Sequence, residues 1–123
     1  MTNPSSIILY VGDTLKSRAF YSNLFQRQPV ESSDNFSGFA FESGLFIGLW
    51  VRPKVMPVAS APAGAAEIGF TMADGKAVDA LYADWRARGV GIAQEPTDME
   101  FGRTFTALDP DGHRLRVFAA PAQ

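Results

Sequence analysis

The chain contains no cysteine, only one histidine and no long hydrophobic run. The lack of cysteine excludes disulfide bonds and thiolate metal sites, and it favours a cytoplasmic protein. No apolar stretch approaches the roughly 18 residues that cross a bilayer, and the short run IILYV lacks the basic flank of a signal peptide. The 11 basic residues are spread along a chain of net charge −2, so we expect no nucleic-acid partner and no membrane partner.

Aromatic residues, by contrast, are abundant. The 123 residues include ten Phe, three Tyr and two Trp, and 46% of the chain is hydrophobic. A chain of this length and composition folds as one domain with a sizeable core, so we expect a single domain over residues 1–123.

The hydrophobic pattern predicts the same order of elements twice. In a first module of about residues 5–52, the strand SIILYVGD precedes a helix over TLKSRAFYSNLF, with Asp13 or Thr14 as its N-cap. The strands QPVES, GFAFES and GLFIGLWV follow. A Pro- and Ala-rich linker spans about 53–65.

The second module, about residues 66–120, repeats this plan. EIGFTMAD predicts a strand, GKAVDALYADWRARG a helix with Trp85 on its core face, and GIAQE, GRTFTALD and HRLRVFAA three more strands. The two modules align by matching Ser6 with Glu67, Asp13 with Asp74, Gly44 with Gly112, Gly48 with Arg116, and Trp50 with Phe118. We therefore predict an α+β fold, in which two βαβββ modules form a curved mixed sheet around a cleft and the helices cover the outer face.

Alternation along the strands separates two kinds of face. One parity is uniformly apolar and is predicted to pack under the helices: Ile7, Leu9, Val11, Ile68, Phe70, Met72, Leu115 and Val117. The other parity mixes aromatic, small and charged residues, as a ligand-binding wall does: Ser6, Ile8, Tyr10, Phe46, Gly48, Trp50, Glu67, Gly69, Thr71, Arg114, Arg116 and Phe118. The facing of Phe39, Phe41 and Phe105 is not determined by this pattern.

Three motifs carry a family resemblance: VGD before SRAFYSNLF, EIGF before a helix ending in RARGV, and FGRTFTALDPDGH. With them the chain resembles, over nearly its whole length, the vicinal oxygen chelate superfamily of glyoxalases, bleomycin resistance proteins and dioxygenases. In metal-using members of that superfamily, the ligand positions correspond here to Ser6, Gly48, Glu67 and Arg116. Gly48 has no side chain, and Arg116 is a cation without a lone pair, so we predict no metal and no other cofactor.

Glu67 and Arg116 occupy neighbouring strands of one module in this family's fold. A carboxylate and a guanidinium in that arrangement can form a bidentate ion pair. We therefore expect the pair to fill the position of the metal; the alternative is that each charge reaches solvent separately.

GLW, AEIGF and FGRTF followed by DPDGHRLRV are similar to the metal-free, antibiotic-binding members, which include phenazine and bleomycin resistance proteins. That likeness implies a homodimer, commonly with exchanged strands, which sequesters a planar aromatic antibiotic stoichiometrically. Two alternatives stay open. One is an enzyme of the same superfamily with an atypical or absent metal site, for example with Glu67 as a base; the other is an accessory protein that binds a metabolite.

No catalytic residue is assigned. The candidate ligand-binding residues are Ser6, Tyr10, Phe46, Gly48, Trp50, Met56, Glu67, Arg103, Arg116 and Phe118. Trp50 is expected to stack on the ligand, with a core or dimer-interface role as its alternative. Arg103 has a structural role as its alternative, Met56 is a candidate cover of the cleft, and His113 is expected to belong to a turn.

Overall fold

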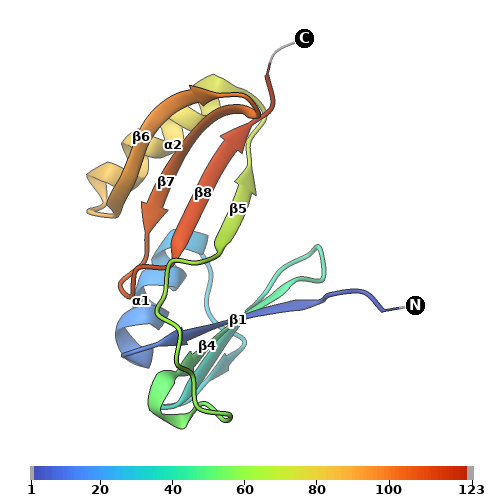
Figure 1. The fold of residues 1–123 in the computed structure, drawn as a ribbon, viewed down its shortest axis with the longest axis vertical. Coiled ribbons are helices and arrows are strands. Elements are labelled where there is room, and N and C mark those ends of the chain that lie inside the picture. The colour runs from blue at the N-terminus through green and yellow to red at the C-terminus, as the bar shows by residue number, and fades with distance from the viewer. Residues whose placement is uncertain (1, 122–123) are drawn as a thin grey trace. The chain divides into compact units, whose positions relative to one another are not determined.

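The computed structural model describes residues 2–121, and its contacts divide the chain into two units, Met1–Ala61 and Pro62–Gln123 (Figure 1). The boundary falls inside the predicted linker. Each unit consists of one α-helix and one four-stranded mixed sheet. The predicted α+β fold with a repeated βαβββ order is therefore confirmed.

Unit 1 contains the shorter strands. Its elements are β1 (Ser6–Val11), α1 (Thr14–Phe25), β2 (Glu31–Ser32), β3 (Phe36–Ala40), β4 (Phe46–Val51) and the 3₁₀ turn η1 (Arg52–Lys54). The strand order is β1-β4-β3-β2, with β1 parallel to β4 and the other neighbours antiparallel.

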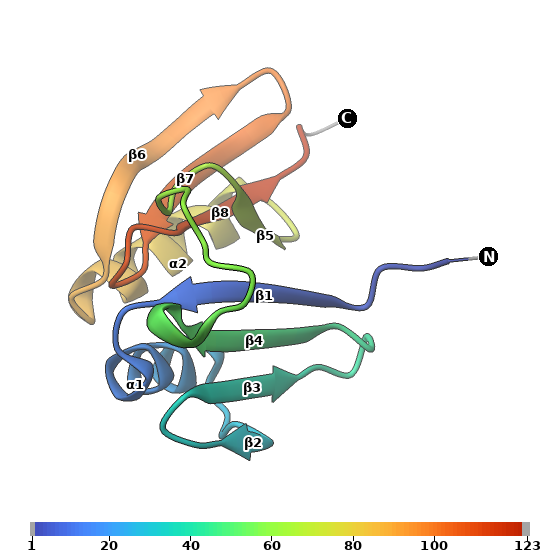
Figure 2. The same cartoon turned by 60° about the horizontal axis from the view of Figure 1, so that its bottom comes forward.

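Unit 2 repeats this topology. Its elements are β5 (Glu67–Thr71), α2 (Gly75–Ala87), β6 (Gly91–Met99), β7 (Gly102–Leu108) and β8 (Arg114–Ala119). The order β5-β8-β7-β6, with β5 parallel to β8, matches the first unit strand for strand (Figure 2).

Equivalent local signals start the two helices. Asp13 accepts a hydrogen bond from the Lys16 amide at 3.1 Å, and Asp74 accepts one from the Ala77 amide at 2.8 Å. Each carboxylate satisfies a backbone donor that has no partner within its helix. The choice between Asp13 and Thr14 is thereby decided for Asp13, and the predicted alignment of the two modules is confirmed at both caps.

Three strand boundaries differ from the prediction. β2 is shorter than QPVES, and β3 begins at Phe36, two residues before the predicted start. β6 continues from the predicted GIAQE through Pro96 to Met99, with irregular pairing to β7 around Gln94. A bulged edge strand tolerates proline, which cannot donate to a ladder; this explains why Pro96 does not end the strand.

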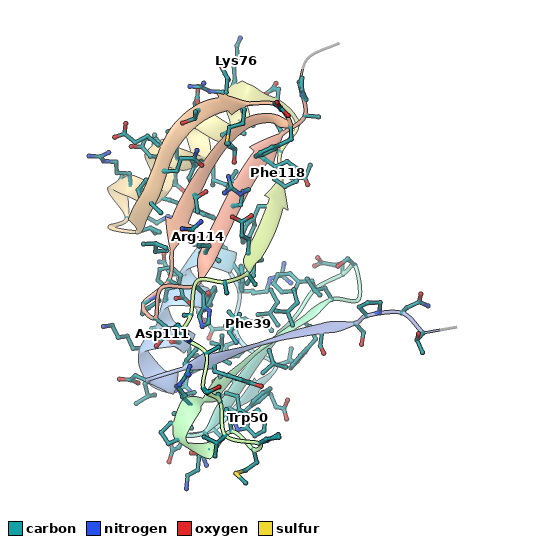
Figure 3. All side chains as sticks on the ribbon, viewed as in Figure 1. Phe39, Trp50, Lys76, Asp111, Arg114 and Phe118 are labelled. Carbon is teal, nitrogen blue, oxygen red and sulfur yellow. The ribbon has the colours of Figure 1, made fainter. Side chains whose placement is uncertain are left out.

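Aromatic rings build the core between each helix and its sheet. In unit 1, Phe25 contacts Phe39 at 5.4 Å and Phe41 at 5.0 Å between ring centroids. In unit 2, Phe105 contacts Trp85 at 5.5 Å. Phe39 (labelled in Figure 3) and Phe105 are completely buried and Trp85 nearly so, which settles the facing of both phenylalanines and confirms Trp85 as core.

One predicted core position is wrong. Ile7 is 38% exposed, much like its neighbour Ile8. Figure 2 shows α1 beside the C-terminal part of β1, so the first half of this strand lacks the helical cover that buries Val11. Within the described residues, no helix is long and apolar enough to span a membrane.

Candidate functional site

The face of the unit 1 sheet that lies opposite α1 is rich in aromatic side chains. We call it the aromatic face and define it by Ile8, Tyr10, Phe36, Phe46 and Trp50 together with the glycines 38 and 48. The strand register places these residues side by side: Tyr10 pairs with Trp50, Phe36 with Trp50, and Gly38 with Gly48.

Two paired glycines make room for the rings. A Cβ atom on Gly38 would lie 2.1 Å from Cζ of Phe46, and one on Gly48 would lie 2.7 Å from Cζ of Phe36. The rings of Phe36 and Phe46 are nearly parallel, with centroids 6.3 Å apart and planes inclined by 11°. They therefore lie over backbone that any larger residue would push them away from.

Trp50 lies at the end of β4 on this same face. Its ring meets that of Tyr10 edge-on, with centroids 6.3 Å apart, and both side chains keep contact with solvent. Figure 3 labels Trp50 on unit 1. Ser6 is exposed and pairs with Phe46 at the other end of the face. The parity prediction thus places Ser6, Tyr10, Phe46, Gly48 and Trp50 together on the aromatic face.

The equivalent face of unit 2 is polar, and the Glu67–Arg116 ion pair lies at its centre. Nε of Arg116 donates to Oε1 of Glu67 at 2.8 Å. Nη1 of the same guanidinium donates to Oε1 of Gln94 at 3.2 Å and to the hydroxyl of Thr104 at 3.3 Å. The expected ion pair is confirmed, but Arg116 divides its donors among three side chains instead of forming the bidentate pair.

This geometry sets the protonation of both partners. The hydrogen bond from Arg116 holds the pKa of Glu67 below its ordinary value against the opposing effect of burial, and the charge of Arg114 adds to the lowering. The same hydrogen bond raises the pKa of Arg116. Glu67 is therefore an ionised hydrogen-bond acceptor at neutral pH.

Arg103 lies on the opposite face of the unit 2 sheet. It pairs in register with Ala119, and its guanidinium binds Asp79 at 2.8 Å and Asp98 at 3.1 Å. These hydrogen bonds raise the pKa of Arg103. The structure therefore separates Arg103 from Arg116 and supports its structural alternative.

Phe118 shares the polar face with Arg116, since β8 alternates and Phe118 pairs with Thr104. Its ring contacts that of Phe101 with centroids 6.2 Å apart. Met56 lies in the segment that follows η1 and is 72% exposed, whereas its neighbour Val55 is buried and anchors that segment. Its predicted role as a cover stays a prediction.

His113 belongs to a turn, as expected. The carboxylate of Asp109 accepts hydrogen bonds from the backbone amides of Asp111 at 2.9 Å and His113 at 2.8 Å, and this closes the turn before β8. Among residues 2–121, no group of three or more His, Cys, Asp or Glu side chains lies close enough together to hold a metal ion.

Several neighbours of the candidate residues escaped prediction: Phe36, Gln94, Phe101, Thr104 and Thr106. Phe36 was missed because β3 starts earlier than its pattern indicates. The threonines carry a usable signal, since they alternate with the buried Phe105 and pair in register with Phe118 and Arg116. Gln94 and Phe101 carry none, because the irregular pairing of β6 breaks the alternation.

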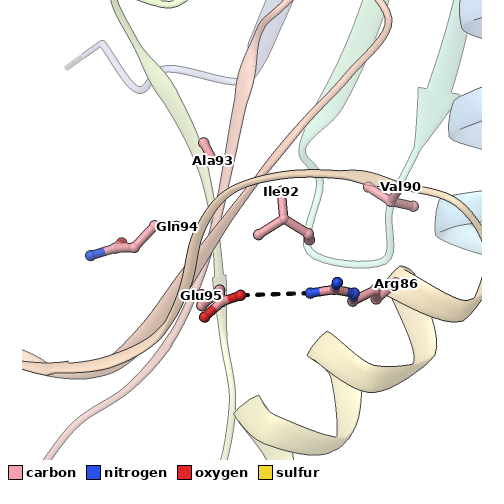
Figure 4. Close-up of a pocket in the computed structure, with 6 residues that line it drawn as sticks. All are labelled: Arg86, Val90, Ile92, Ala93, Gln94 and Glu95. Atoms are coloured by element: carbon pink, nitrogen blue, oxygen red, sulfur yellow. Dashed lines mark ion pairs between the residues drawn. The ribbon is translucent and has the colours of Figure 1, made fainter.

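Three hollows lie within single units. One, of about 310 Å³, lies on the polar face and is lined by Ala93, Gln94, Met99, Thr106, Arg114 and Arg116. A second, of about 340 Å³, lies between α2 and β6 (Figure 4), and there Arg86 is paired with Glu95 at 3.7 Å. A third, of about 620 Å³, runs along α1 and includes Leu15 and Arg18.

Known proteins share this sequence and fold. The family model of the glyoxalase/bleomycin resistance protein/dioxygenase superfamily matches residues 4–117. The phenazine antibiotic resistance protein EhpR of Enterobacter agglomerans is 32% identical over 117 residues, which cover 93% of this chain and 89% of that protein.

Solved structures agree. Protein ATC0852 from Agrobacterium tumefaciens is 47% identical with a TM-score of 0.91, and the match covers 99% of this chain and 100% of that one. A glyoxalase-related enzyme from Fulvimarina pelagi has a TM-score of 0.85 at 21% identity, covering 98% and 90% of the two chains, and shows the fold alone. By its sequence over nearly its whole length, the chain belongs to the glyoxalase/bleomycin resistance protein/dioxygenase superfamily.

Proposed function

We propose that the protein binds and sequesters a planar aromatic small molecule, an antibiotic of the phenazine or bleomycin kind, and so confers resistance without a metal. The observation that carries this proposal is the aromatic face of unit 1, where Trp50 and Tyr10 stay accessible beside the two phenylalanines. The relative from Enterobacter agglomerans, which is named for phenazine resistance, supports the choice of ligand.

Stacking is the interaction that this face supplies. Each good aromatic pair contributes about 0.5–1.5 kcal/mol beyond the burial of its area. A ligand without hydrogen-bonding groups along its plane therefore binds best to a surface of this kind. The polar face of unit 2 provides groups suited to a ligand's polar substituents, with Arg116 held in place by Glu67.

The chemistry of the four family positions supports metal independence. Gly48 contributes no donor, and Arg116 carries a positive charge that repels a cation. Glu67 is the one strong ligand of the set, and its carboxylate is already bound to Arg116 at 2.8 Å. A divalent ion needs three or four protein donors in such a site, so these residues do not fit one.

The lowered pKa of Glu67 weighs against the enzymatic alternative. A general base works best with a pKa near the operating pH, and the hydrogen bond from Arg116 moves Glu67 in the opposite direction. Capture of the intact ligand is accordingly favoured over proton abstraction by this carboxylate.

Fluorescence titration with a phenazine tests the proposal. We expect quenching that saturates at about one ligand per chain, and a roughly tenfold or greater loss of affinity in Trp50→Ala. Trp85→Phe is the matched control, since Trp85 is buried in the core and its replacement should leave quenching intact. Recovery of the unchanged ligand by chromatography distinguishes capture from turnover.

Two results would contradict the proposal. One is the absence of quenching across a broad panel of aromatic drugs, and the other is stoichiometric divalent metal in the purified protein. We also propose a cytoplasmic homodimer, which light scattering tests through a mass twice the 13.3 kDa of one chain. A monomer at micromolar concentration would overturn that part.

A further inference from the structure

The hollow on the polar face of unit 2 offers many hydrogen-bond donors and few acceptors. The amide of Gln94 decides this balance. Its Oε1 accepts from Nη1 of Arg116 and from the hydroxyl of Thr106, both at 3.2 Å. Its Nε2 is thereby turned toward Sδ of Met99 at 3.5 Å, and a thioether is only a weak acceptor. The amide oxygen is used inside the network, while the N–H₂ group stays available.

The charges on this face do not cancel. Arg116 is neutralised by Glu67. Arg114, two residues earlier on β8, also lines the hollow and is exposed; among residues 2–121 its side chain takes part in no ion pair. Figure 3 labels Arg114 on unit 2. One unpaired positive charge therefore adjoins the free amide donor of Gln94.

An apolar wall borders the same hollow. Met99 and Phe101, at the turn between β6 and β7, are each 45% exposed. The guanidinium carbon of Arg116 lies 5.7 Å from the centroid of the Phe101 ring. Gly102 holds the turn: its φ is +129°, and a Cβ there would lie 1.8 Å from the carbonyl oxygen of Ala119. No other residue fits this turn, so the position of Phe101 is a built feature.

We propose that the ligand is an aromatic anion, a flat ring system bearing a carboxylate, which the hollow reads through Arg114 and Gln94. The carboxylate accepts from the guanidinium of Arg114 and from Nε2 of Gln94, and the ring lies against Met99 and Phe101. This inference rests on the proposed function and names the chemical class of its ligand. The hollow of Figure 4 makes no such selection, because Glu95 already balances its Arg86.

Calorimetry with two probes of the same shape tests the charge requirement. Phenazine-1-carboxylate and phenazine-1-carboxamide differ in charge but share the tricyclic ring. We expect the carboxylate to bind the wild-type protein about tenfold more tightly, equivalent to ~1.4 kcal/mol. Raising NaCl from about 50 to about 500 mM should reduce this ratio, because salt screens exposed charges.

Variants locate the effect. Arg114→Gln should bring the ratio of the two affinities close to one, while Arg114→Lys should retain most of it. Arg86→Gln removes an arginine from the other hollow and serves as the matched control, with an unchanged ratio. Phe101→Ala should weaken both probes equally, since it removes the wall and leaves the charge. A thermal melt of each variant checks that it is folded.

The possible failures are distinguishable. Equal affinity of both probes for the wild-type protein would overturn the inference and leave the proposed function in place. A ratio that survives in Arg114→Gln would also overturn it, since the selection would then lie elsewhere. If neither probe binds, the proposed function fails for this ligand class, and the inference fails with it.

Discussion

The two units share a topology and differ in the face that lies opposite the helix. At equivalent register positions, the pair Gly38–Gly48 in unit 1 corresponds to Thr106–Arg116 in unit 2. In unit 1 the glycines leave space that neighbouring rings fill, and in unit 2 the larger residues fill it with a hydrogen-bonded network. One backbone plan thus presents either an aromatic or a polar surface, depending on whether these inner positions carry side chains.

The largest expected effect comes from filling the glycine space of unit 1. Gly38→Ala and Gly48→Ala should each lower the free energy of unfolding by about 1–3 kcal/mol, since the added Cβ displaces a packed ring. Chemical denaturation measures this. Gly69→Ala in unit 2 is the control, because its Cβ would meet Phe118 at 3.5 Å, an ordinary contact. Equal effects at all three sites would show that the rings do not depend on the glycines.

The turn glycines test how closely the backbones of the two units correspond. Gly44 and Gly112 have φ values of +95° and +92°, and a Cβ added to either would meet no atom within 4 Å. Alanine at either position should therefore cost only backbone strain, about 1–2 kcal/mol. We expect the two losses to agree within about 0.5 kcal/mol in denaturant melts. Gly91→Ala, which lacks a positive φ, is the control, and unequal losses would break the correspondence.

The smallest expected effect belongs to the ion pair of unit 2. Glu67→Gln should lower stability by about 0.5–1 kcal/mol near neutral pH, because the pair is partly exposed. The pKa of Glu67 is lowered in the folded state, so its contribution is present above the ordinary value of 4.5 and is lost as the pH falls through the lower folded value.

Unfolding curves for the wild-type protein and Glu67→Gln should therefore converge in acid. Glu95→Gln, which removes a more exposed pair with a 3.7 Å separation, should have a smaller effect at every pH. A gap between wild type and Glu67→Gln that stayed constant down to acid pH would show that the carboxylate's charge is not what matters.

Local chemistry made much of the fold predictable. The caps at Asp13 and Asp74 and the apolar alternation of β8 depend on neighbouring residues, so they can be read without a structure. β6 could not be predicted in full, because its bulges are set by pairing with β7. The exposure of Ile7 depends on where α1 ends relative to β1, which alternation does not encode.

The candidate site divides in the same way. The sequence by itself determined the repeated module, the family and the replacement of metal ligands by Gly48 and Arg116, because residue identity and spacing carry that information. Only the tertiary structure decided that Arg103 pairs with Asp79 on the far face and that Gln94 turns its amide donor outward. Those outcomes depend on which strands are neighbours and on which oxygen accepts from which nitrogen, and contacts between distant residues settle both.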